Sequence, residues 1–121
     1  MNTSNVLLDL KQYKGYYSSK LELKNNILVL LLKKKDDDIA SVRIVFNGVL
    51  SFEDTGFIGK QVSYCDVGLL GFKNQYLCRE KGLNPDDYRQ IIFITEVEMG
   101  KVELIISCSE VEIILSTDVS G

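Results

Sequence analysis

The chain has 121 residues, of which 45% are hydrophobic and 26% are charged, and its formal net charge is −3. These proportions are typical of a globular domain, and nine glycines with a single proline argue against a disordered or low-complexity chain. The length fits one domain, residues 1–121, which can bury roughly two-thirds of the surface of its unfolded chain.

Histidine does not occur in the sequence, which removes the commonest general base at neutral pH and the commonest transition-metal ligand. The three cysteines, Cys65, Cys78 and Cys108, are far apart and form no CxxC pair, so they indicate neither a disulfide framework nor a zinc site. We expect reduced cysteines that serve packing, with Cys108 inward beside Ile106 and Val111. The sequence therefore predicts a protein without enzymatic activity, metal or cofactor.

The N-terminal residues lack a basic segment followed by a long apolar run, so we predict no signal peptide. The longest apolar run, Ile27–Leu32, is far shorter than the about 20 residues that a membrane-spanning helix needs. We therefore expect a cytoplasmic protein that does not interact with membranes.

The first predicted elements are a helix and a hairpin. Residues 5–17 carry apolar side chains near helical spacing, with Gly15 as a stop signal. Residues 20–24 and 27–35 then form two strand-like runs around Asn25-Asn26, which indicates a β-hairpin. The second run has no polar alternate, so we expect that the hairpin does not face solvent on both sides.

The next segment predicts a turn followed by a strand. Residues 33–40 place a lysine block beside an aspartate block, which is typical of a solvated turn. The strand-like residues 41–52 put Val42, Ile44 and Phe46 on one face. The Asn47-Gly48 pair inside this run indicates either a turn or a β-bulge.

Residues 53–82 contain five glycines, and the only element that we predict there is a helix from Phe72 to Lys81 that ends at Gly82. A turn is expected at residues 84–87. Two strands, 87–100 and 101–115, then follow, joined at Met99-Gly100 and with a kink in the second at residues 107–110. The predicted fold is a single α+β domain, mostly antiparallel β-sheet with one or two short helices.

Several binding motifs are disfavoured. The spaced glycines of GFIGK and GLLGFKNQ match neither a P-loop nor a dinucleotide fingerprint, and Asp36–Asp38 lack the spacing of an EF-hand loop. The run Lys33–Lys35 precedes those aspartates directly and has no aromatic stacking motif, while the isoelectric point is about 4.9. We therefore predict no nucleic-acid binding.

The two ends of the chain carry opposite charge. Residues 1–35 contain seven lysines against two acidic residues, a net charge of +5, and residues 96–121 contain one lysine against six, a net charge of −5. If the last two strands pair, three glutamates lie close together, and two more follow along the final strand. The predicted acidic face consists of Glu96, Glu98, Glu103, Glu110 and Glu112.

Two interpretations of this face remain open. It can be a merely solvated sheet surface, or it can be complementary to a basic partner, because clustered like charges destabilise a strand pair in the free protein and accelerate association with an oppositely charged one.

The order of elements resembles that of small bacterial immunity proteins of polymorphic toxin and contact-dependent growth inhibition systems. The features are the hairpin LELKNNILVLLL, the following VRIVFNGV with its aromatic residue before a glycine, and the terminal VELIISCSEVEI. The resemblance implies a non-enzymatic protein that binds a cognate toxin domain, often a nuclease, and blocks its active site or substrate surface. It implies no catalytic residues.

We therefore expect a protein that neutralises a basic toxin by docking its acidic face. The alternative is a structural or regulatory protein that self-associates, as a homodimer for example, through an exposed strand such as the final one.

Overall fold

The computed structural model describes residues 3–34, 37–96 and 101–115. This part of the chain contains helices and strands in the order α1 (Thr3–Lys11), β1 (Tyr17–Lys24), β2 (Ile27–Lys34), β3 (Asp37–Asn47), β4 (Ser51–Asp54), β5 (Tyr64–Gly68), α2 (Phe72–Glu80), the 3-10 helix η1 (Pro85–Asp87), β6 (Arg89–Glu96), β7 (Lys101–Cys108) and β8 (Glu110–Leu115). The predicted α+β fold dominated by antiparallel sheet is confirmed.

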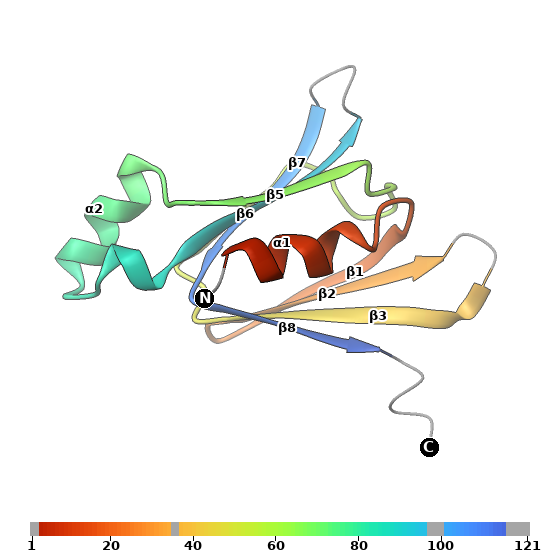
Figure 1. The fold of residues 1–121 in the computed structure, drawn as a ribbon, viewed down its shortest axis with the longest axis horizontal. Helices are drawn as coiled ribbons and strands as arrows, with labels where there is room; N and C mark the ends of the chain where they lie inside the picture. The colour runs from red at the N-terminus through yellow and green to blue at the C-terminus, as the bar shows by residue number, and fades with distance from the viewer. Residues whose placement is uncertain (1–2, 35–36, 97–100, 116–121) are drawn as a thin grey trace.

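The strands form two four-stranded antiparallel sheets that face each other (Figure 1). Sheet A has the order β1-β2-β3-β8, and sheet B has the order β4-β7-β6-β5. The predicted hairpins are both present, because β1 pairs with β2 and β6 pairs with β7. The final strand β8 instead pairs with β3, so it belongs to the other sheet.

One corner joins the two sheets, because the chain crosses there twice, from β3 to β4 and from β7 to β8. The Leu50 N–H donates to the Ser107 carbonyl at 2.8 Å, and the Ser109 N–H donates to the Asn47 carbonyl at 3.0 Å. Gly48 turns the first crossing with a φ of +61°. The predicted kink at residues 107–110 is confirmed at Ser109, while Asn47-Gly48 is neither a hairpin turn nor a bulge but a corner between sheets.

The opposite side is closed by backbone hydrogen bonds between residues 15–18 and 59–62. The Gly15 N–H donates to the Val62 carbonyl at 2.8 Å, and the Ser18 N–H donates to the Lys60 carbonyl at 2.9 Å. Helix α1 packs against β5 on this side and lies between the two sheets (Figure 1). The interior is therefore enclosed on both sides.

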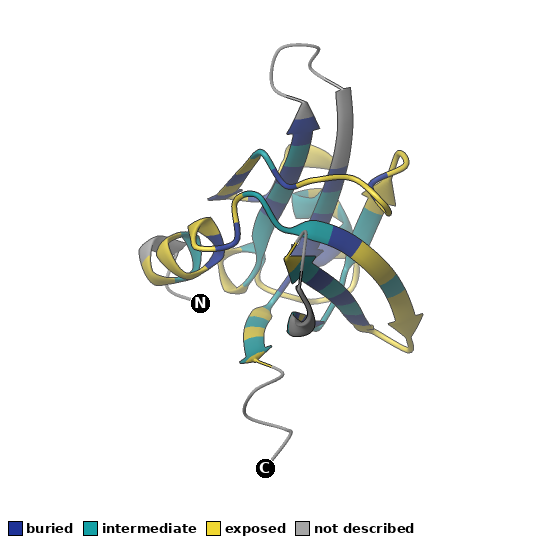
Figure 2. Cartoon of the chain, turned by 90° about the vertical axis from the view of Figure 1, so that its right-hand side faces the viewer, coloured by how far each residue is buried: buried dark blue, intermediate teal, exposed yellow. Residues whose placement is uncertain are grey.

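The side chains that alternate toward the inside of the strands fill the interior. Buried residues alternate with half-buried or exposed ones along β2, β3 and β5 (Figure 2). The inward set includes the predicted Val42, Ile44 and Phe46, which are at most 3% exposed. Phe93 of β6 contacts Phe46 and Phe57, with ring centroids 6.3 Å and 5.6 Å away. The core is thus built from both sheets, as face-to-face sheet packing requires.

All three cysteines are buried and free, as predicted. Cys65 and Cys108 belong to the main core, and Ile106 and Val111 belong to or pack against the same cluster. Burial raises the pKa of the Cys65 thiol to about 11 and that of Cys108 to about 12. At neutral pH both are protonated thiols that act as small apolar side chains.

Three predicted boundaries differ from the structure. Helix α1 ends at Lys11, four residues before the predicted stop at Gly15. Gly15 itself has a φ of +93°, and its N–H donates to the Val62 carbonyl. Strand β3 begins at Asp37, so the turn predicted at 33–40 is much shorter. Strand β5 was not predicted. Helix α2 is confirmed within one residue of its predicted end, and Gly82 follows it with a φ of +72°.

Among the described helices, none combines the length and apolar character needed to cross a membrane.

Candidate functional site

The predicted acidic face is divided between the two sheets. In sheet B, Glu96 pairs with Lys101, and Glu103 pairs with Ile94, so two of the five glutamates are in the β6–β7 hairpin as predicted. Their side chains and the whole of Glu98 lie outside the described part of the molecule.

The other two glutamates, Glu110 and Glu112, are in β8 of sheet A and are exposed. Strand β7 runs for five residues from Glu103 to the corner, a length of about 17 Å at the rise of a β-strand. The glutamates of the described strands are therefore divided between the β6–β7 hairpin of sheet B and β8 of sheet A. The sequence could not predict this division. A strand with a kink and two strands in different sheets show the same alternation of apolar and polar residues.

Glu110 and Glu112 instead share a surface with apolar side chains, which we call the outer face of sheet A. Strand register places Glu112 beside Val45 and Val45 beside Val29, and in the next row Ile114 is beside Arg43 and Arg43 beside Leu31. The alternate residues of β2 and β3 point into the core, so these residues point outward. The apolar centre of the face consists of Val29, Leu31, Val45 and Ile114, all half-buried.

The apolar centre is half-buried although none of the described elements lies over it. Strand β2 is apolar on both of its faces, a pattern typical of a strand that is covered on both sides. Lys20, Glu22 and Arg43 line a shallow groove of about 360 Å³ together with Val29 and Leu31.

The charged residues on this face are unevenly distributed: the β1 edge carries two lysines and Glu22, Arg43 lies in the middle, and the β8 edge carries glutamates. On the β1 side, Lys20 Nζ lies 2.6 Å from Glu22 Oε1, and this contact lowers the pKa of the Glu22 carboxyl. Lys24 is also exposed on that strand. The β8 side carries Glu110 and Glu112, neither of which forms a salt bridge with a described residue. The face therefore has a β1 edge with a net charge of +1 from Lys20, Glu22 and Lys24, a mostly apolar centre that includes Arg43, and an acidic β8 edge.

This arrangement has the anatomy of a protein interface, in which an apolar centre is surrounded by a polar, solvated rim. Strand β8 also has a free edge, because β3 is its only partner among the described strands. Within the same residues no three His, Cys, Asp or Glu side chains come close enough to hold a metal ion.

Helix α2 presents a second apolar surface that sequence reasoning missed. Leu69, Phe72 and Tyr76 are 70%, 89% and 63% exposed. The signal was available, because Phe72 and Tyr76 are four residues apart and so share a helix face. This surface has no glutamate of the predicted set.

No protein-family model, curated protein or solved structure matches this chain.

Proposed function

We propose that this chain is a non-enzymatic binding protein that neutralises a cognate bacterial toxin domain, and that it docks through the outer face of sheet A. The observation that carries the proposal is the position of Glu110 and Glu112 at the rim of an uncovered apolar centre. Burial of the apolar centre stabilises the complex by roughly 25 cal/mol per Å² of apolar surface. The carboxylates orient the partner and raise the rate of association.

The partner class follows from charge and from the resemblance to immunity proteins. An acidic edge complements a basic surface, and nucleases carry basic surfaces because they bind phosphate backbones. A toxin domain of this kind would place its basic residues over Glu110 and Glu112 and an apolar patch over Val29 and Val45.

The test reverses the charge of the acidic edge in the variant Glu110→Lys/Glu112→Lys. We expect slower association with the toxin encoded beside the gene, a weaker dependence of that rate on salt, and reduced growth protection. Asp86→Lys/Asp87→Lys is the matched control, since it makes the same change in net charge at exposed positions of η1. Equal protection by both variants, with unchanged association rates, contradicts the proposal.

A second function, self-association, is favoured by the uneven distribution of charge on the same face. A two-fold axis parallel to the strands stacks two copies face to face and places β1 of one copy over β8 of the other. Lys20, Glu22 and Lys24 then lie above the edge that carries Glu110 and Glu112, so two lysines and one glutamate face two glutamates. Such an isologous contact is the commonest form of homodimer.

Sedimentation velocity distinguishes the two functions without a toxin. Self-association predicts a concentration-dependent dimer that the variant Glu110→Lys/Glu112→Lys dissociates and that Lys20→Glu/Lys24→Glu combined with it restores. A monomer at all concentrations excludes the second function and leaves the first intact.

A further inference from the structure

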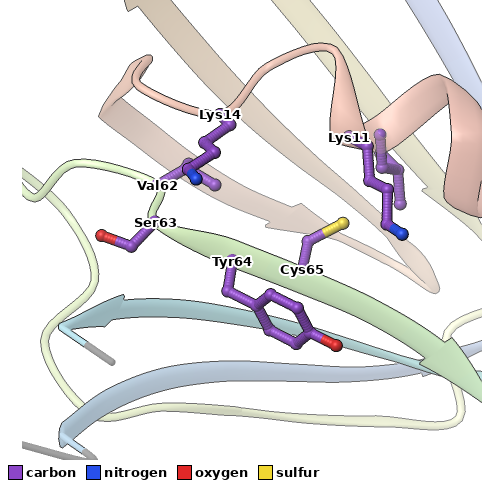
Figure 3. Close-up of a pocket in the computed structure, with 7 residues that line it drawn as sticks. Lys11, Lys14, Val62, Ser63, Tyr64 and Cys65 are labelled. Atoms are coloured by element: carbon purple, nitrogen blue, oxygen red, sulfur yellow. The ribbon is translucent and has the colours of Figure 1, made fainter. Parts of the chain in front are cut away.

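A pocket of about 340 Å³ lies between α1 and β5, away from the outer face of sheet A (Figure 3). One wall comes from the end of α1 and the turn after it, with Leu10, Lys11 and Lys14. The other wall is the segment that enters β5, residues 62–65. The volume is at the small end of the range of ligand pockets, about 300–1,000 Å³.

The floor of the pocket is apolar. Leu10, Val62 and Cys65 line it and are 1%, 2% and 3% exposed, so their apolar groups belong to the packed core. Burial keeps Cys65 in the thiol form at neutral pH, because it raises the thiol pKa to about 11. The floor therefore carries no negative charge that would repel an anion.

The rim of the pocket is basic. Lys11 and Lys14 are exposed, and neither forms a salt bridge with a described residue. Figure 3 shows both lysine side chains reaching from the helix side toward β5, with the Tyr64 ring beside the strand. The Lys11 ammonium is close enough to Cys65 to lower its thiol pKa in opposition to burial.

Two carboxylates lie near this rim, and Asp66 is close enough to Cys65 to raise its thiol pKa, in opposition to Lys11. Asp66 directs Oδ1 to the Val67 N–H, which donates to it at 2.9 Å, and Asp9 acts on Tyr13 of the core instead, where it helps to raise the phenol pKa. Neither Asp66 nor Asp9 lines the pocket. The other polar side chain of the wall, Ser63, uses its hydroxyl to donate to the Thr95 carbonyl.

We propose that this pocket binds a small organic anion, a molecule with one sulfonate, carboxylate or phosphate group on an apolar or aromatic body. The anionic group is held at the rim by a lysine ammonium group, and the body lies in the pocket against the segment of residues 62–65. The acidic group and the apolar body are both required, because the rim supplies charge and the floor supplies only apolar contact. This site does not depend on the proposed function.

The experiment compares two probes that differ by one charged group. 8-Anilinonaphthalene-1-sulfonate carries a sulfonate, and N-phenyl-1-naphthylamine has the same aromatic body without it. Fluorescence titration of the folded protein is expected to give one site for the sulfonate and at least tenfold weaker binding of the neutral amine. Inorganic phosphate at high concentration is expected to compete with the sulfonate.

Variants then locate the site. Lys11→Glu/Lys14→Glu should weaken sulfonate binding at least tenfold, while Lys73→Glu/Lys81→Glu, with the same change in net charge at other exposed positions, should leave it within twofold. Thermal unfolding of each variant verifies that it is folded. If Lys11→Glu/Lys14→Glu does not fold, Lys11→Gln/Lys14→Gln replaces it.

Four results overturn the proposal. The first is equal affinity for the two probes, and the second is unchanged sulfonate binding in both lysine pair variants of the pocket. The third is loss of sulfonate binding in Phe72→Ser, which would place the probe on the exposed face of α2 instead. Binding of phosphate alone, without any contribution from the aromatic body, likewise contradicts an amphiphilic ligand.

Discussion

Gly48 shows how one residue fixes the corner between the sheets. It has a φ of +61°, and a Cβ built on it would lie 2.2 Å from Ser109 Oγ, inside any normal contact distance. Ser109 Oγ in turn donates to the Asn47 carbonyl at 3.1 Å. A side chain at position 48 must therefore adopt an unfavourable backbone conformation and also displace the Ser109 hydroxyl.

Replacing Gly48 with alanine is expected to lower the free energy of unfolding by about 1–3 kcal/mol, the usual cost of a strained backbone position. Urea denaturation measures this change. Gly71→Ala is the matched control, because Gly71 has a φ of −70° and nothing within 4 Å of its added Cβ. Equal stability of the two variants would show that the corner tolerates a side chain.

The buried thiols predict how stability responds to alkaline pH. A cysteine in the unfolded chain titrates near pH 9, whereas the folded pKa of Cys65 is about 11. Between these values the unfolded chain has lost the proton and the folded chain still binds it, so stability must fall as the pH rises.

The free energy of unfolding is thus expected to fall from pH 9 to pH 11, and to fall less steeply in Cys65→Ala. The native Cys65 thiol should also alkylate about a hundredfold more slowly than that of the urea-unfolded protein at pH 8, because only the thiolate reacts and the folded pKa is about 11. Stability that rises over this interval, or rapid alkylation of all three native thiols, contradicts the burial.

Some residue roles were predictable and others were not. The inward position of Cys108 follows from its parity with Ile106, which a single strand pattern reveals. The role of Gly48 does not, because its close neighbour Ser109 is 61 positions away in sequence. A contact between residues so far apart in sequence depends on the pairing of β3 with β8. A local sequence pattern does not predict which strands pair.

At the scale of elements, helix α2 is held on sheet B by one polar side chain. Ser51 Oγ donates to Asn74 Oδ1 at 2.8 Å, and Asn74 Nδ2 donates to Ser107 Oγ at 3.1 Å. Ser51 and Ser107 are direct partners in the β4–β7 pairing, and Ser107 is only 1% exposed. Asn74 therefore joins the helix to two strands at one point.

Asn74→Ala should cost about 1–3 kcal/mol of stability, because it removes a partner from the buried Ser107 hydroxyl. It should also expose the Cys78 thiol, which lies on the buried side of the same helix. The measurement is the rate of Cys78 alkylation in a Cys65→Ala/Cys108→Ala background. Lys73→Ala, one residue away and exposed, is the control and should leave the rate unchanged.

Helices and strands were predictable where the spacing of apolar residues and the positions of turn residues indicate the same boundaries. The hairpin around Asn25-Asn26 is an example, since Asn25 adopts the positive φ of 58° that a tight turn requires. Strand β5 was missed because it has five residues, lies among glycines and exposes Tyr64 and Asp66. Its place in the sheet is fixed by pairing with β6 rather than by its own pattern.

At the scale of the whole molecule, the continuous apolar run of β2 indicates burial on both sides. The core covers Leu28, Leu30 and Leu32, and the described chain leaves Val29 and Leu31 on the outer face. The sequence pointed to a covered second face but could not show that it adjoins Glu110 and Glu112. That neighbourhood arises only when β8 crosses into sheet A.

Growth protection against the cognate toxin that the proposed function requires, measured with a charge in the apolar centre, tests docking through the outer face of sheet A most directly. We predict that Val45→Glu abolishes protection, because a carboxylate there lies between Val29 and Glu112 and must be desolvated without a partner. Phe72→Glu, on the exposed face of α2, should protect like the unmodified protein. Full protection by a folded Val45→Glu variant, with loss in Phe72→Glu, would contradict docking through the outer face of sheet A.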